Sequence, residues 1–157
     1  MKSIRLLLAL GLTALLGTAV HAHDKNAPLD NEQKQFLVQY EMVRAALAAD
    51  DLAGAKKAAA VVAAMPVIHH ENGVDAPPGF VQDARKFADA NSLEAAREVF
   101  VSLSKRAVHV TENKPGYFVI HCKMFPKGEG DWVQTTSKIN NPYMGRSMPG
   151  CGTIIGK

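Results

Sequence analysis

The chain has 157 residues, with 18 lysines and arginines against 15 aspartates and glutamates, giving a formal net charge of +3. Two of the basic residues lie in residues 1–22, so the remainder is almost neutral. A protein that binds nucleic acid or an anionic membrane is expected to carry an excess of basic residues, and this chain does not have one. The length suits one domain with a real core and is too short for two ordinary ones.

The N-terminus has the pattern of a secretory signal peptide. Lys2 and Arg5 precede an apolar run over residues 6–20, and Val20-His21-Ala22 supplies the small residues of a cleavage site. The run is short for a membrane span and no second one follows, so we expect no stable membrane insertion. We predict a signal peptide over 1–22, a flexible N-terminus over 23–30, a single domain over 31–157 and a periplasmic location.

Hydrophobic residues recur at helical spacing in four segments, which predicts four amphipathic helices. Asp30 with Gln33 matches a capping box before the first helix, and Asn91 with Glu94 matches one before the fourth. Asp50-Asp51 is expected to cap the second helix. Short connections favour a mainly α fold, a small antiparallel four-helix bundle. The predicted helices cover about 31–49, 52–64, 80–90 and the segment from the second capping box to about 109.

The composition changes after Pro115-Gly116, and a small C-terminal lobe is expected there. Residues 117–120 are aromatic and β-branched, which predicts a strand, and 132–135 are expected to pair with them as a β-hairpin across a turn at 127–130. The tail from Asn140 onwards is predicted to be loop. Trp132 and Tyr143 are expected to be packing anchors of this lobe.

The same lobe contains both cysteines and three of the six methionines of the chain. Thiolate and thioether sulfurs are soft ligands suited to Cu(I). On a strand, Cys122 and Met124 would project to one face. Met148 and Cys151 are three positions apart in a turn that contains Pro149 and Gly150. These four sulfurs form the candidate metal site.

A disulfide is the alternative interpretation of the two cysteines. In an oxidising compartment two cysteines normally pair. A bond between Cys122 and Cys151 would close a loop of about 30 residues, which the chain-entropy model values at roughly 3–4 kcal/mol. A disulfide cannot supply thiolate ligands at the same time, so the two states exclude each other.

Several other side chains are weaker candidates for metal binding. His121 and Met144 are further donors for the sulfur site, although Met144 also fits core packing and a strand would point His121 away from Cys122. The loop segment His69-His70-Glu71, with His109, is more typical of solvated histidines, and His23 becomes a chelating N-terminus only after cleavage. Met42 and Met65 are expected to pack in the core or at its edge. No nucleophile elbow, Cys-x-x-Cys pair or phosphate loop appears, so we do not expect an enzyme.

The chain resembles a family on several ordered motifs. The family is the uncharacterised periplasmic domain found alone, or at the C-terminal end, of adaptor proteins of copper and silver efflux systems. The resemblance covers about residues 34–154. The matching segments are Leu47–Ala53, Ala96–Ser104, Cys122 with Met124, Gly130-Asp131-Trp132, Asn141–Gly145 and Met148–Gly152.

The resemblance implies metal handling and no reaction. It favours Cys122 and Cys151 as thiolate ligands of Cu(I) or Ag(I), with Met124 and Met148 as thioether ligands, in a periplasmic carrier or buffer. Copper or silver efflux and delivery proteins are the implied partners. The alternative function is a disulfide-stapled module that docks on an efflux or sensor partner without metal. The chain departs from the family at Lys123, where a proline is expected, and at Met144, where an aromatic residue is expected.

Overall fold

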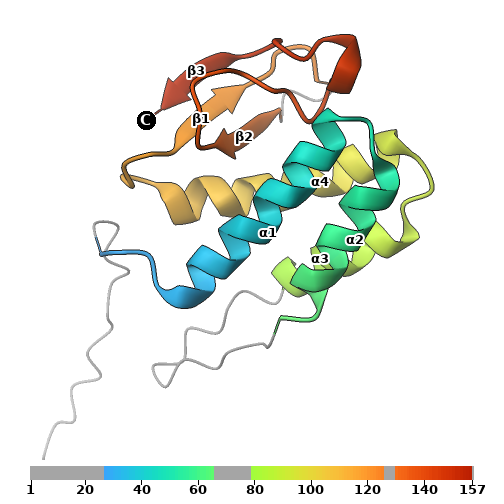
Figure 1. The fold of residues 1–157 in the computed structure, drawn as a ribbon, viewed down its shortest axis with the longest axis horizontal. Coiled ribbons are helices and arrows are strands. Elements are labelled where there is room, and N and C mark those ends of the chain that lie inside the picture. The colour runs from blue at the N-terminus through green and yellow to red at the C-terminus, as the bar shows by residue number, and fades with distance from the viewer. Residues whose placement is uncertain (1–26, 66–78, 126–129, 157) are drawn as a thin grey trace, which may run out of the picture.

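A computed structural model describes residues 27–65, 79–125 and 130–156 (Figure 1). The predicted signal peptide, His23, the loop residues His69–Glu71 and most of the predicted turn at 127–130 lie outside the described residues. The elements are α1 (Asn31–Ala48), α2 (Leu52–Ala63), α3 (Gly79–Asp89), α4 (Leu93–Thr111), β1 (Phe118–His121), β2 (Asp131–Gln134), the short 3-10 helix η2 (Gly145–Ser147) and β3 (Thr153–Gly156).

The predicted mainly helical fold is confirmed, and all four predicted helices are present. The hydrophobic positions that predicted α1 are buried, among them Tyr40, Val43 and Leu47. On α4 the same holds for Phe100 and Leu103. The three- and four-residue spacing therefore identified the faces that form the core.

The helix starts agree with the sequence in two cases and differ in one. Asp30 and Gln33 form the complete capping box of α1, and the Asp51 side chain caps α2 by accepting a hydrogen bond from the Gly54 amide. For α4, the prediction that Asn91 is the capping residue was wrong. The cap is Ser92, whose hydroxyl oxygen accepts a hydrogen bond from the Ala95 amide at 3.1 Å.

The C-terminal lobe is a three-stranded antiparallel sheet in the order β2-β1-β3. The predicted hairpin is confirmed, because Val119 pairs with Val133 and Ile120 with Trp132. The prediction that the tail from Asn140 onwards is loop was wrong for residues 153–156. Thr153–Gly156 forms β3, because β1 offers this segment of three β-branched residues an edge with which to pair.

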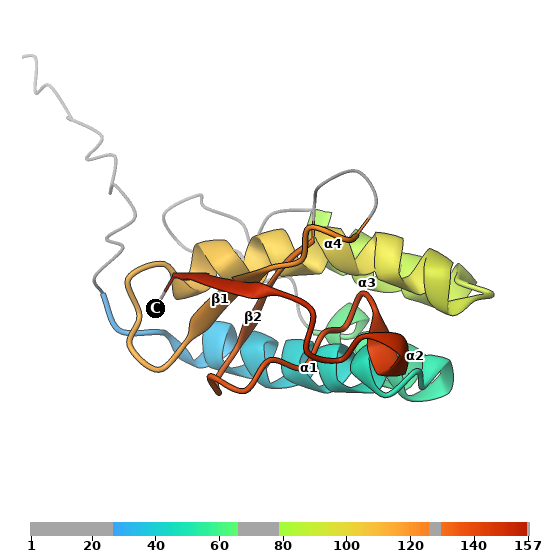
Figure 2. The same cartoon turned by 90° about the horizontal axis from the view of Figure 1, so that it is seen from above.

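The sheet covers one side of the helices. Figures 1 and 2 show it lying across α1 and α4, with α2 and α3 on the opposite side of that helix pair, and β2 packs directly on α4. A row of aromatic rings runs through this interface. Tyr40 stacks on Phe100 at 5.3 Å between ring centroids, Phe100 meets Tyr143 at 5.6 Å, and Tyr143 meets the fully buried Trp132 edge-on at 6.0 Å. The predicted anchoring roles of Trp132 and Tyr143 are confirmed.

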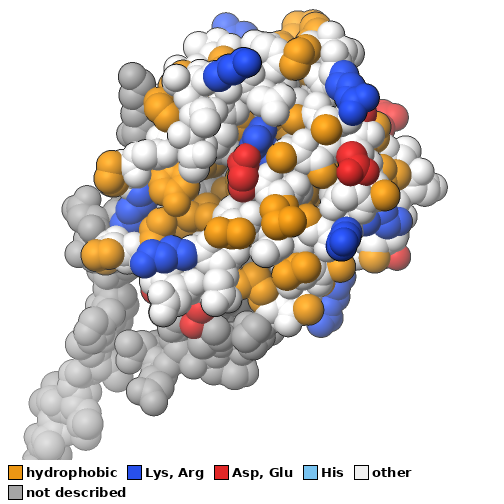
Figure 3. Space-filling view, in the orientation of Figure 1, with side chains coloured by type: hydrophobic (Ala, Val, Ile, Leu, Met, Phe, Trp, Pro, Cys, Tyr) orange, Lys and Arg blue, Asp and Glu red, His pale blue; other side chains and the backbone are white. Residues whose placement is uncertain are grey.

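Hydrophobic side chains also reach the surface. Figure 3 shows them on the face that carries α1, interspersed with charged side chains of both signs. The prediction that Met42 packs in the core or at its edge was wrong, since this residue is 53% exposed on α1, whereas Met65 does pack against the core. Within the described residues, no helix is long and apolar enough to cross a membrane.

The Tyr40 hydroxyl gives a first test of this interface. It accepts a hydrogen bond from the Val133 amide at 3.0 Å and lies 3.2 Å from the Ser104 hydroxyl, and all these groups are buried. Tyr40→Phe leaves the Val133 amide without its partner, so we expect a loss of about 1–3 kcal/mol in the free energy of unfolding. Urea denaturation measures it.

Tyr117→Phe is the matched control, because the Tyr117 hydroxyl makes no hydrogen bond to the described residues and its ring is only partly buried. A loss as large as that of Tyr40→Phe would contradict the assigned role of the Tyr40 hydroxyl.

Candidate metal centre

The two cysteines lie together at the start of the tail strand. The β1–β3 register pairs His121 with Thr153, so Cys122 and Cys151 flank the same end of this strand pair. Both thiols are free, and their sulfur atoms are 3.4 Å apart. The fold therefore brings together the two thiols that the sequence selected.

The Cys122 side of the pair is fully buried. The Cys122 amide donates to the Gly130 carbonyl at 2.9 Å, and a Cβ on Gly130 would lie only 2.5 Å from the Cys122 carbonyl oxygen. Glycine at 130 thus lets the two backbones approach each other.

Cys122 and Met124 were predicted to share a strand face, and this prediction was wrong. Strand β1 ends at His121, and Cys122–Phe125 form a turn closed by the Phe125 amide and the Cys122 carbonyl. In this turn Cys122 is buried while the Met124 side chain is 61% exposed.

Cys151 is held by its backbone. Its carbonyl accepts a hydrogen bond of 2.6 Å from the side-chain amide of the fully buried Asn141, and its amide donates to the Met148 carbonyl at 3.1 Å. The latter bond closes the predicted turn through Pro149 and Gly150. Cys151 as a whole residue is intermediate between buried and exposed.

The two candidate thioether residues border Cys151 through their backbones. The Met124 backbone makes a hydrogen bond with the Cys151 thiol. The Met148 carbonyl accepts a hydrogen bond from the Cys151 amide. Their side chains are 61% and 36% exposed, respectively. Each methionine thus lies in the same turn as one of the cysteines, at a more exposed position than that cysteine.

The additional candidates lie in different settings. The Met144 side chain packs against the hydrophobic core, and its amide donates to the Asn141 side chain at 2.9 Å. The His121 ring contacts the cross-strand Asp131 carboxylate at 2.5 Å through Nδ1. His109 is exposed in the last turn of α4.

The separation of the two sulfur atoms fits one shared metal ion. Two sulfurs that bind one ion at about 2.3 Å in a tetrahedral arrangement lie about 3.8 Å apart, so the observed pair would open only slightly. Within the described ranges, no group of three or more His, Cys, Asp or Glu side chains is arranged to hold a metal. Thioethers of the neighbouring methionines would extend the donor set in a way that favours soft ions.

The environment of Cys151 resists ionisation in the absence of metal. The hydrogen bond with Cys122 is the main cause that raises the pKa of the Cys151 thiol, and desolvation raises it further, while the Met124 backbone acts in the opposite direction. A metal must displace this proton, so binding is expected to strengthen with rising pH.

An ion pair docks the loop before Cys151 on the helices. The Arg97 guanidinium donates to the Asp50 carboxylate at 2.5 Å and to the Pro142 carbonyl at 2.8 Å. The same carboxylate accepts a hydrogen bond from the Arg146 amide at 3.2 Å. Of the pair Asp50-Asp51 that was expected to cap α2, only Asp51 does so. The Asp50 backbone lies in the left-handed region, and its carboxylate contacts Arg97 instead.

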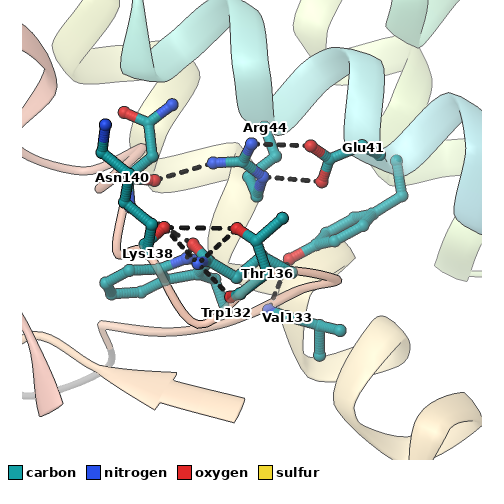
Figure 4. Close-up of polar contacts among 9 residues, drawn as sticks. Glu41, Arg44, Trp132, Val133, Thr136, Lys138 and Asn140 are labelled. Carbon is teal, nitrogen blue, oxygen red and sulfur yellow. Dashed lines mark hydrogen bonds and ion pairs between the residues drawn. The ribbon is translucent and has the colours of Figure 1, made fainter. Parts of the chain in front are cut away.

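A second arginine fixes the start of this loop (Figure 4). Arg44, which is almost fully buried, makes a bidentate ion pair with Glu41 and donates to the Asn140 carbonyl at 2.7 Å. The Gln134 side chain accepts from the Trp132 indole and donates to the Lys138 carbonyl. Together these contacts hold both ends of the segment from β2 to Asn140.

The residues that sequence analysis missed are those that position Cys151. Asn141 had been noted only within the motif that carries the resemblance, and Arg97 only within the matching helical run. The Asn141 side chain makes three hydrogen bonds, with the Cys151 carbonyl and with the amides of Tyr143 and Met144. The signal present in the sequence was the Asn-Pro turn, which marks a polar side chain that folds back on its own backbone.

Comparisons with protein families, with curated proteins and with solved structures gave no match for this chain.

Gly145 tests the docking of the loop. Its φ is +54°, and a Cβ would lie 1.9 Å from an Asp50 carboxylate oxygen and 2.3 Å from Arg97 Nη2. Gly145→Ala therefore combines a left-handed alanine with a clash, and should lower the free energy of unfolding by more than about 1–2 kcal/mol. Denaturant unfolding measures this loss.

Gly150→Ala is the matched control. A Cβ at Gly150 meets nothing within 4 Å, so its effect should stay within about 0.5 kcal/mol. Equal losses in the two variants would contradict the close approach of Asp50 and Arg97 to Gly145.

The Asp50 carboxylate gives a prediction on pH. Partial burial raises its pKa, but the hydrogen bond from Arg97 and the Arg146 amide outweigh this and hold the pKa below its ordinary value of 3.8. The stabilisation is therefore complete above that value and is lost as the pH falls through the lowered pKa. Asp50→Asn should be less stable than the wild type at pH 6, and the gap should shrink below pH 3.8.

Urea unfolding of both proteins at several pH values measures this gap. A gap that stays constant from pH 6 down to the acid limit would show that the Asp50 charge does not contribute.

Proposed function

We propose that this protein binds a soft monovalent metal ion, Cu(I) first and Ag(I) next, as a carrier or buffer. The observation that carries the proposal is the pair of free thiols 3.4 Å apart, bordered by two exposed methionines. Cys122 and Cys151 would act as thiolate ligands, and Met124 and Met148 as thioether ligands. Met144 and His121 are candidates for an extra donor, each after a side-chain rearrangement.

The arrangement of the sulfurs supports exchange of the ion as well as binding. Thiolates give the strong bonds and are partly or fully buried, while the thioethers lie at the surface where a donor or acceptor has access. Thioethers are neutral, so adding them does not increase the charge of the site. A carrier needs this combination, because an ion enclosed on all sides is released slowly.

The cellular setting is part of the same proposal. The predicted signal peptide would place the protein in the periplasm, and the resemblance to the domain of copper and silver efflux adaptors indicates efflux or copper-delivery proteins as partners. We also propose that the helices form an antiparallel four-helix bundle, supported by contacts of α1 with α2, α2 with α3, α3 with α4 and α1 with α4.

Anaerobic titration of the reduced protein with Cu(I), against a chromophoric competitor, tests the metal ligands. Losing an outer partner of a metal ligand already costs about 10–100-fold in affinity, so Cys122→Ser or Cys151→Ser should cost more than about 100-fold. Met124→Leu and Met148→Leu should weaken binding less, and Met42→Leu should leave it unchanged.

Met42 is the matched control for the thioethers, since it is similarly exposed but lies on α1 outside the sulfur lobe. Unchanged affinity in both serine variants would contradict the site. A reduced protein that binds no Cu(I) would favour the alternative, a disulfide-stapled module that docks on an efflux or sensor partner.

A further inference from the structure

The distance between the Cys122 and Cys151 sulfur atoms lies between the values for a disulfide bond and for a shared metal ion. A disulfide bond is about 2.05 Å long, and a shared metal ion would place the sulfurs about 3.8 Å apart. The observed 3.4 Å is close enough to both that small side-chain movements suffice for either. The same two thiols can therefore serve as ligands or be joined to each other.

The two cysteines differ in exposure. Cys122 is fully buried beneath the backbone of Gly130. Cys151 is partly exposed and follows three exposed residues, Met148, Pro149 and Gly150. An external disulfide can reach Cys151 along this turn, whereas it cannot reach Cys122 in the folded protein.

We propose that Cys122 and Cys151 form a reversible dithiol–disulfide couple in which Cys151 reacts with an external disulfide and Cys122 completes the bond. First Cys151 loses its proton, and this thiolate, which the hydrogen bond with Cys122 keeps a minor fraction, attacks one sulfur of the donor. The donor S–S bond breaks, and one donor sulfur leaves as a thiolate and takes up a proton. Then the Cys122 thiolate attacks the Cys151 sulfur and displaces the second thiol. The protein loses two electrons and two protons, and the donor disulfide is reduced to two thiols.

The backbone around Cys151 supports this order of steps. Asn141 holds the Cys151 carbonyl, and the turn to Met148 holds its amide, so the sulfur that receives the external group stays next to Cys122. Gly152 allows the same segment to approach β1 and β2 closely, because a Cβ there would lie 2.8 Å from both Ile120 and Trp132. The second attack is therefore intramolecular between groups already in contact.

The consequence for metal, which rests on the proposed function, is that oxidation closes the site. A disulfide offers no thiolate, so the oxidised protein retains only the two thioethers and loses most of its affinity for Cu(I). Reduction restores it, and the partial exposure of Cys151 gives a reducing thiol access to the bond.

Oxidised glutathione at pH 8.5, followed by acid quench and intact-mass measurement, tests the couple. The wild type should lose about 2 Da as the bond forms. Cys122→Ser should instead gain about 305 Da at Cys151, because the second step is blocked, and Cys151→Ser should react at least about ten-fold more slowly. Dithiothreitol should reverse both products.

Two controls keep the result specific to the fold. In 8 M urea, Cys151→Ser should react as fast as Cys122→Ser, and circular dichroism should show that both variants are folded without urea. Equal rates in the folded variants, or accumulation of a mixed disulfide in the wild type, would overturn the proposal.

A Cu(I) titration of the oxidised and re-reduced wild type forms a separate arm. A loss of at least about 100-fold on oxidation, recovered on reduction, supports closure of the site. Equal affinity in both forms would overturn it. If the reduced protein binds no Cu(I), the proposed function fails while the mass results still decide whether the couple exists.

Discussion

The C-terminal lobe depends on the side chain of Asn141. This buried side-chain amide donates a hydrogen bond to the Cys151 carbonyl and accepts hydrogen bonds from the backbone amides of Tyr143 and Met144. One side chain therefore holds both the turn after Asn141 and the residue that leads into β3. A buried amide that loses such partners costs more than each bond contributes alone. The first of these bonds holds the backbone of Cys151, whose sulfur lies 3.4 Å from that of Cys122.

The lobe is in turn fixed to the helices by polar groups as well as by the aromatic row. Arg97 contacts Asp50 at the joint of α1 and α2 and the carbonyl of Pro142, while Arg44 contacts Asn140. Each arginine thus pairs with a carboxylate of the helical part and donates a hydrogen bond to a carbonyl of the loop. Loops of irregular shape need such donors, because their carbonyls have no partners in a helix or sheet.

Local sequence patterns predicted the elements whose stability is local. The spacing of Tyr40, Val43 and Leu47 was sufficient for α1, and the β-branched and aromatic run before His121 was sufficient for β1. The patterns failed where a distant contact decides. Asp50 resembles a cap but contacts Arg97, 47 positions away, and β3 forms because β1 offers it an edge.

The candidate site was predictable in part for the same reason. Sulfur clustering in the sequence correctly indicated that Cys122 and Cys151 meet. The prediction of a shared strand face for Cys122 and Met124 failed, because the backbone turns at Cys122 to meet Gly130. Sequence spacing alone does not reveal where a short strand ends, so the exposure of Met124 required the structure.

The proposed function requires sulfur atoms from two separate turns to bind one soft ion. X-ray absorption at the copper edge of the reduced, Cu(I)-loaded protein tests this most directly. The account predicts a first shell of sulfur at about 2.3 Å, with fewer sulfur scatterers in Met124→Leu and Met148→Leu than in Met42→Leu. A shell dominated by nitrogen or oxygen, or one unchanged when Cys122 and Cys151 become serine, would contradict it.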